Sequence, residues 1–215
     1  MFTPASIAAL IIASSFAAGL NIYATVLTLG ILARTHLVLL PPGLDPLGHT
    51  WILITCAILF AVEFFADKIP ALDMVWNLLH TFIRIPIAAL VAYHASSQLT
   101  PQMQVLATAL GAAIALAAHT SKTAVRAAVT PSPEPISNIA LSTTEDAVAI
   151  GLTWFATHHP IIAAAIAIVL LSASILAARK LLRAIQRPLQ RIFRPDLNSP
   201  DLSPAKISSS NTPPQ

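Results

Sequence analysis

Two acidic residues stand inside a strongly apolar stretch and are the first groups of this chain that could do chemistry. Glu63 and Asp67 are four residues apart, so on a helix they share one face. Two carboxylates one turn apart can hold a cation or share a proton. Alternatively, Asp67 and Lys68 mark a helix end at the lipid headgroups. That explanation suits Lys68 but not Glu63, whose four nearest neighbours in the sequence are all apolar.

A second group of polar residues leads along one helical face to the most deeply placed cation of the sequence. The group is Asp73, Asn77, His80 and Arg84, spaced 0, 4, 7 and 11. A charge at the bilayer centre costs about 2.5–3.5 kcal/mol even on the scale derived from insertion experiments. We therefore expect Arg84 to have an internal partner, either Glu63 or an acid from a later helix. A structural ion pair and a contact to an anionic ligand both fit this pattern.

A third group consists of three side chains that can donate hydrogen bonds and that share one face of a predicted helix. His119, Lys122 and Arg126 are spaced 0, 3 and 7. Three donors on one stripe suit a phosphate or a carboxylate. Cations at the cytoplasmic end of a membrane helix arise equally from the positive-inside rule, so both interpretations stay open.

The last acidic pair, Glu145 and Asp146, follows a segment at 131–135 in which proline alternates with other residues. Such a segment cannot be helical and predicts an extended backbone. Ser142 and Glu145 have the spacing of a capping box, which predicts a helix start near Ser142. The same residues also fit a re-entrant hairpin, in which an extended stretch and a half-length helix line a cavity. These two interpretations are compatible.

The sequence around these groups is too apolar for a soluble domain. Of its 215 residues 56% are hydrophobic and 10% are charged, against about 25% charged residues in soluble domains. A run of about 20 apolar residues is enough to cross a bilayer, and the chain has six apolar segments. They are residues 7–33 (interrupted at 19–21), 51–66, 76–94, 105–118, 142–157 and 161–178. The sequence therefore predicts an all-α, polytopic transmembrane helix bundle of about six spans.

Each half of this bundle places an acidic pair beside an interrupted helix, Glu63 with Asp67 and Glu145 with Asp146. This arrangement indicates a weak 3+3 inverted repeat, a feature of many transporters. We expect three parts of the chain: a transmembrane helical domain at 1–178, a basic amphipathic juxtamembrane helix at 179–194 and a disordered polar tail at 195–215.

The distribution of Lys and Arg predicts the orientation. Residues 179–215 hold seven of the twelve basic residues and two of the nine acidic ones. With six spans, Lys68, Lys122, Arg126 and this basic segment lie on one side, and Arg34 alone lies on the other. The positive-inside rule then predicts a multi-pass protein of the cell (inner) membrane with both termini in the cytoplasm. The partners that we expect are the lipid bilayer and, at the basic helix, anionic lipid headgroups. We expect no nucleic acid partner, and homo-oligomerisation stays open.

Enzyme signatures are mostly missing from the sequence. It contains no GxSxG, HExxH, P-loop or GxGxxG motif. Its single cysteine, Cys56, lies in an apolar run and can form neither an intramolecular disulfide nor a CxxC site. We therefore predict no catalytic residues, no metal centre and no cofactor. The missing motifs count against an enzymatic function but do not exclude it.

Five motifs in order along the chain resemble a family of bacterial and plastid-type membrane proteins, known only as domain of unknown function 4126. The motifs are Gly19-Leu-Asn21-Ile-Tyr23, Glu63-x-x-x-Asp67-Lys68-x-Pro70-x-x-Asp73-x-x-Trp76, His119-x-x-Lys122-x-x-x-Arg126, Ser132-Pro133-x-Pro135-x-Ser137-Asn138 and Ser142-x-x-Glu145-Asp146. The resemblance covers roughly residues 5–160 and implies a membrane protein, but it implies no activity. Where the family is expected to carry Asp after Trp76, this chain has Asn77, which weakens a metal site.

These observations lead to three hypotheses for the function. The first is a small transporter or lipid-carrier translocase, whose acids handle a proton or cation and whose bases contact an anionic solute or headgroup. The second is a membrane enzyme that acts on a phosphorylated lipid, and the third is a non-catalytic scaffold held together by interhelical charges. The candidate substrate-binding or ion-binding residues are Glu63, Asp67, Asp73, Arg84, His119, Lys122, Arg126, Glu145 and Asp146.

Overall fold

The computed structural model describes the backbone of residues 2–129 and 135–193, and the side chains of residues 2–69, 76–127 and 139–184. The chain divides into two units, residues 1–182 and 183–215, and the candidate site lies within the first. The described residues form helices and no strand. The elements are α1 (Pro4–Leu20), α2 (Ile22–Thr35), the short 3₁₀ helix η1 (Pro42–Gly48), α3 (Thr50–Ala66), α4 (Pro70–Ala95), α5 (Pro101–Val129), α6 (Pro135–His158) and α7 (Pro160–Phe193). The all-α class is confirmed.

A single residue separates α1 from α2. Asn21 has an extended backbone, with φ −147° and ψ 106°, so the helix cannot continue through it. Its side-chain oxygen accepts a hydrogen bond from the backbone N–H of Ala24 at 2.9 Å, which caps the start of α2. The interruption predicted at 19–21 is therefore a break between two helices.

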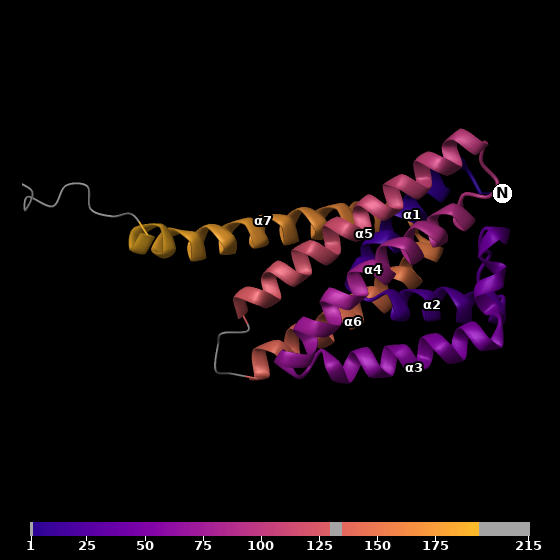
Figure 1. The fold of residues 1–215 in the computed structure, drawn as a ribbon. Helices are drawn as coiled ribbons and strands as arrows, with labels where there is room; N and C mark the ends of the chain where they lie inside the picture. The colour runs from indigo at the N-terminus through magenta and orange to yellow at the C-terminus, as the bar shows by residue number, and fades with distance from the viewer. Residues whose placement is uncertain (1, 130–134, 194–215) are drawn as a thin grey trace, which may run out of the picture. The chain divides into compact units, whose positions relative to one another are not determined.

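The two helices fold back on each other, so both outer ends of the pair lie at one end of the unit. Pro4 lines a cavity with residues 98–100 and Met103, near the connection of α4 to α5. The last residues of α2 lie at this same end of the unit, where Arg34 donates a hydrogen bond to Thr50 at 2.6 Å. Gly43, in the η1 segment that follows α2, lies against the carbonyl of His94. We call this end of the unit the His94 end. In Figure 1, α1 and α2 both extend from the side of the N-terminus towards the break that separates them.

The structure revises two expectations. Residues 7–33 are a helical hairpin whose two outer ends both lie at the His94 end, where the sequence predicted one interrupted span. The re-entrant element predicted near 131–157 is not present among the described residues there, because α6 is a continuous helix of 24 residues. Ser142 and Glu145 lie inside α6 with buried side chains and therefore do not form a capping box at a helix start. Residues 130–134 lie outside the described residues.

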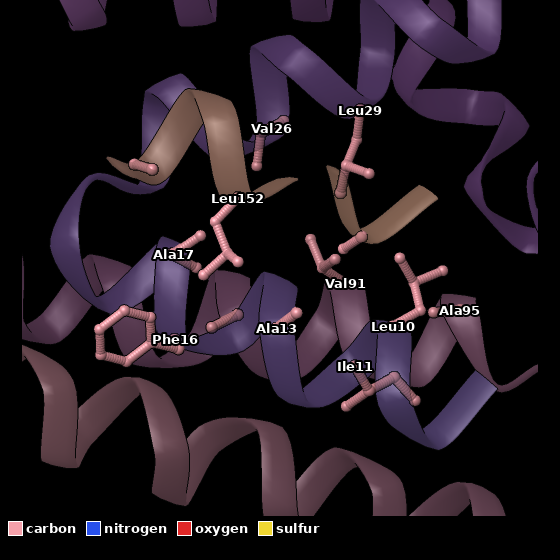
Figure 2. Close-up of a cluster of buried hydrophobic side chains, with 14 of the residues drawn as sticks. Leu10, Ile11, Ala13, Phe16, Ala17, Val26, Leu29, Val91, Ala95 and Leu152 are labelled. Atoms are coloured by element: carbon pink, nitrogen blue, oxygen red, sulfur yellow. The ribbon is translucent and has the colours of Figure 1, made fainter. Parts of the chain in front are cut away.

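The hairpin is the centre of the unit, and α3, α4, α5 and α6 pack against it. Most of α1 is buried, including Leu10, Ile11 and Phe16, and small residues line its contact with α5. Figure 2 shows these side chains packing with Val26 and Leu29 of α2 and with residues of α4 and α6. A helix that is apolar on all sides is a buried helix, which explains why α1 lacks charge altogether.

The surrounding helices expose apolar side chains on their outer faces. Leu78, Leu79 and Phe82 of α4 are each more than half exposed, on the side of α4 opposite its polar face. By length and composition, three described helical segments could cross a membrane: 76–95, 101–127 and 160–184. A fourth arises if η1 and α3, which meet at a bend of 69°, count as one broken span. The described residues therefore contain three or four candidate spans, where the sequence predicted about six.

Candidate functional site

The break between α1 and α2 lies against the deepest cation of the chain. Arg84 on α4 is fully buried and forms an ion pair with Glu63 on α3, one of the partners expected from the sequence. The same guanidinium donates to the backbone carbonyl of Leu20 at 2.7 Å. The last carbonyls of a helix have no partner within the helix and carry its negative dipole end. Arg84 thus satisfies both a carboxylate and the end of α1.

Lys122 on α5 joins the same helix end to acids from two further helices. Its ammonium group donates to the Leu20 carbonyl at 2.8 Å. It lies 3.2 Å from Glu145, 3.4 Å from Asp67 and 3.8 Å from Glu63. Lys122 is 4% exposed, so these interactions occur away from bulk water, where charges are screened least.

Arg126, one turn further along α5, extends the network towards the end of α3. Its guanidinium contacts Asp67 at 2.9 Å and pairs with Glu145 on α6. Asp67 ends α3, and its backbone N–H donates to the carbonyl of Glu63 at 2.9 Å. The network therefore joins three carboxylates and three cations from α3, α4, α5 and α6 around the end of α1. We refer to these six residues as the charged network: Glu63, Asp67, Arg84, Lys122, Arg126 and Glu145.

Asp146 is joined to the hairpin by a separate contact. The side-chain Nδ2 of Asn21 donates to Oδ1 of Asp146 at 2.8 Å, while the side-chain oxygen of Asn21 caps α2. Asp146 is 4% exposed, and Oδ2 has no hydrogen-bond partner in the structure. None of the ion pairs among the described residues involves Asp146.

The histidines lie beside the network rather than in its ion pairs. His119 is 3% exposed and shares a hydrogen bond of 2.8 Å with Thr81. His80 stacks on Trp76 and meets the ring of Tyr23 edge to face. Asn77, His80 and Arg84 all point inward, as their spacing predicted. The backbone of Asp73 belongs to α4, but its side chain lies outside the described residues, as does Glu134.

Two parts of the site were missed by the sequence analysis. The carbonyl of Leu20 and the amide of Asn21 contact Arg84, Lys122 and Asp146, yet neither was a candidate residue. The available signal was the Gly19–Asn21 interruption within an uncharged segment, since a broken helix inside a membrane protein exposes backbone groups that need partners.

A small cavity borders the network on the side of α7. Its volume is about 150 Å³, and Leu20, Lys122, Glu145 and Ser174 are among its lining residues. A water molecule takes up about 30 Å³ in the liquid, so the cavity has room for several waters or one small anion. The described buried residues of α7 are all alanines: Ala163, Ala164, Ala167 and Ala178.

A second, larger cavity lies on the other side of the hairpin tip. It has a volume of about 460 Å³ and an almost entirely apolar wall. Ile22 and Tyr23, which directly follow Asn21, form one part of this wall, and Trp51, Cys56 and Leu90 form others. Among the described residues, no group of three or more His, Cys, Asp and Glu side chains could hold a metal ion.

Long apolar helices around a buried polar centre indicate an all-helical integral membrane protein. A comparison with known families gives the family. The chain belongs to the family described as domain of unknown function (DUF4126), whose model matches residues 8–180. No curated protein and no solved structure matches the chain.

Proposed function

We propose that this protein is a small transporter or lipid-carrier translocase whose binding site is the charged network at the tip of the α1–α2 hairpin. The observation that carries the proposal is the break at Asn21, where the end of α1 meets Arg84 and Lys122. Binding sites of many membrane transporters lie at such discontinuous helices, whose exposed ends interact with ions and charged substrates. Buried ionisable residues within membrane helices are costly and commonly mark substrate or ion pathways.

The two cavities favour a substrate with an anionic part and an apolar part. Lys122 lines the small cavity, where a phosphate or carboxylate could replace Glu145 as its partner. The larger apolar cavity begins at Ile22 and Tyr23, directly beyond the tip. A lipid carrier has this combination of a charged headgroup and a hydrocarbon chain. A small anion would use the small cavity beside Lys122 alone.

The hairpin also changes the orientation that we propose. The basic segment from Arg179 onward favours a cytoplasmic position for the C-terminal end. In this proposal, residues 7–33 enter and leave the membrane at the His94 end without crossing it. The helices α3, α4, α5, α6 and α7 then each cross the membrane once, and this odd number of crossings places the two ends of the chain on opposite sides. We therefore propose a multi-pass protein of the cell (inner) membrane in which the N-terminus lies opposite the cytoplasmic tail. The contact of the 179–194 segment with anionic lipid headgroups stays a prediction.

This orientation predicts opposite labelling of the two ends of the chain in intact cells. In a Cys56→Ala background, Ala5→Cys should react with an impermeant maleimide added outside, because residue 5 lies at the His94 end. Ser209→Cys should react only after the membrane is permeabilised. Equal protection of both cysteines in intact cells would show that both termini are cytoplasmic and that the hairpin does not return to its side of entry.

The transport proposal is tested by access to the small cavity from the two sides of the membrane. Ser121 and Ser174 line this cavity, and neither belongs to the charged network. In the Cys56→Ala background, Ser121→Cys and Ser174→Cys are placed in sealed vesicles of each orientation and treated with impermeant maleimide. We expect labelling from both sides, because a transport site alternates or opens a water path. Ser97→Cys, at the His94 end, is the control and should react from one side only.

The scaffold hypothesis is the second candidate, and one observation favours it. Each cation of the charged network already has an acidic partner, as expected if the charges only join helices. It predicts that the cysteines at 121 and 174 react from one side or not at all. No specific observation favours the membrane enzyme.

A further inference from the structure

Among the side chains that the structure describes, the buried charges around the hairpin tip do not balance. Four carboxylates with described side chains lie here, Glu63, Asp67, Glu145 and Asp146, against three cations, Arg84, Lys122 and Arg126. All seven are less than 9% exposed. If every group were ionised, the cluster would carry one negative charge. An uncompensated charge in an apolar interior is unfavourable by several kcal/mol, and such a group takes up a proton instead.

We propose that Asp146 holds this proton on Oδ2 and is the exchangeable proton site of the protein. The other three carboxylates each contact at least one cation of the charged network. Asp146 has a neutral partner, the Asn21 amide, on Oδ1, and Oδ2 has no partner. Protonation adds one proton from water to Oδ2 and leaves the Asn21 hydrogen bond in place.

The surroundings of Asp146 also allow the proton to leave. The start of α2, the positive end of its helix dipole, lies at Asn21 and favours the ionised carboxylate. Among the charges of this cluster, the cation Lys122 of α5 favours the ionised form, whereas the carboxylates Glu63 and Asp67 of α3 disfavour it. Other buried titratable or charged groups described on the packed helices are Tyr23 of α2, Cys56 of α3, His80 and Arg84 of α4, His119 and Arg126 of α5, and Glu145 of α6. Charges that favour the ionised carboxylate and charges that disfavour it therefore both surround Asp146.

The oxygen atoms near Asp146 fit a proton better than a metal cation. Ca²⁺ takes six to eight oxygen ligands and Mg²⁺ requires a near-octahedral set. On α6 the next inward polar group is Ser142, one turn earlier, whose hydroxyl is buried and has no hydrogen-bond partner in the structure. A hydroxyl and a carboxyl on one helical face suit transfer of a proton through an intervening water. Ser142 lies nearer the start of α6, which is the end away from His94.

The inference deepens the proposed transport function by naming its coupling proton, but its test requires no flux. The full chain is placed in lipid nanodiscs, and infrared difference spectra are recorded between pairs of pH values. We expect a band from the C=O stretch of a protonated carboxyl that disappears as the pH rises. Asp146→Asn should remove this band, because an amide cannot release the proton. Asp45→Asn, which alters an exposed carboxyl of η1, should leave the band unchanged.

A second variant keeps the test independent of the replacement at 146. Asn21→Ser retains a good helix cap but removes the amide that donates to Oδ1. The C=O band of Asp146 should then move to higher frequency, because its hydrogen bond is lost. Absence of a titrating carboxyl band in the wild type, or its persistence in Asp146→Asn, would overturn the inference. If the band behaves as expected while the cysteines at 121 and 174 react from one side only, the proton site stands and the transport proposal fails.

Discussion

Alanine in place of Glu63 or Arg84 alone lowers the free energy of unfolding by about 3–5 kcal/mol, the cost of leaving one partner of a buried ion pair uncompensated. Both side chains are fully buried. Loss of Glu63 leaves Arg84 with the carbonyls of Leu20 and Gly19 as acceptors, and these do not neutralise a charge. Loss of Arg84 leaves Glu63 with Lys122 at 3.8 Å.

The expected loss of stability comes from the charge that is left without its partner. Removing both charges should therefore recover most of the lost free energy of unfolding. Glu63→Leu combined with Arg84→Met fills similar volume with apolar atoms, an exchange that is often neutral or stabilising. Unfolding is followed by circular dichroism in mixed micelles of mild and denaturing detergent. The control is Asp45→Ala at an exposed site. Single variants that lose less than about 1 kcal/mol, the range of surface pairs, would mean that water reaches the pair.

Alanine at Gly19 displaces the hairpin tip and lowers stability by about 1–3 kcal/mol, the usual effect of overpacking a core. A Cβ atom at Gly19 would lie 2.6 Å from the carbonyl oxygen of Ala115 and 2.6 Å from the Cβ of Ala118. Since the first of these atoms is helix backbone, α1 must move away from α5. The next residue is Leu20, whose carbonyl accepts from Arg84 and Lys122, so the movement also stretches two hydrogen bonds of the site.

Gly151→Ala is the matched control for this prediction. A Cβ at Gly151 on α6 meets nothing within 4 Å. Both substitutions gain the higher helix propensity of alanine, about 1 kcal/mol, so their difference isolates the collision with α5. Gly151→Ala should be as stable as the wild type or more so in the same unfolding measurement. If Gly19→Ala unfolds at the same detergent fraction as Gly151→Ala, the close approach of α1 and α5 is not present in the protein.

The apolar segments predicted most helices well, because charged residues and prolines mark their ends. The segment at 51–66 corresponds to α3 (Thr50–Ala66), which is bounded by Asp67 and Pro70. The inward face of α4 and the pairing of Arg84 with Glu63 also followed from spacing and from the cost of an unpaired charge.

The hairpin could not be predicted in the same way. An uncharged segment of this length fits one crossing, and nothing in its periodicity records the direction in which α2 leaves Asn21. The groups that hold the turn come from residues 84, 122 and 146, far along the chain. The spacing of Ser142 and Glu145 led to a wrong prediction of a helix start for another reason. Two residues three apart can form a capping box, but two residues three apart inside a helix also lie side by side on one face.

The sequence positions of the groups that hold the hairpin have a consequence for how the protein is made. The hairpin is synthesised first, yet the donors for the Leu20 carbonyl come from Arg84 and Lys122, and the acceptor for the Asn21 amide is Asp146. In the membrane position that we propose for the hairpin, these backbone and amide groups have no partner until those residues emerge from the ribosome, which costs several kcal/mol. The hairpin thus completes its contacts only after α6 has been made, so the first helices of the unit are the last to be fixed in place.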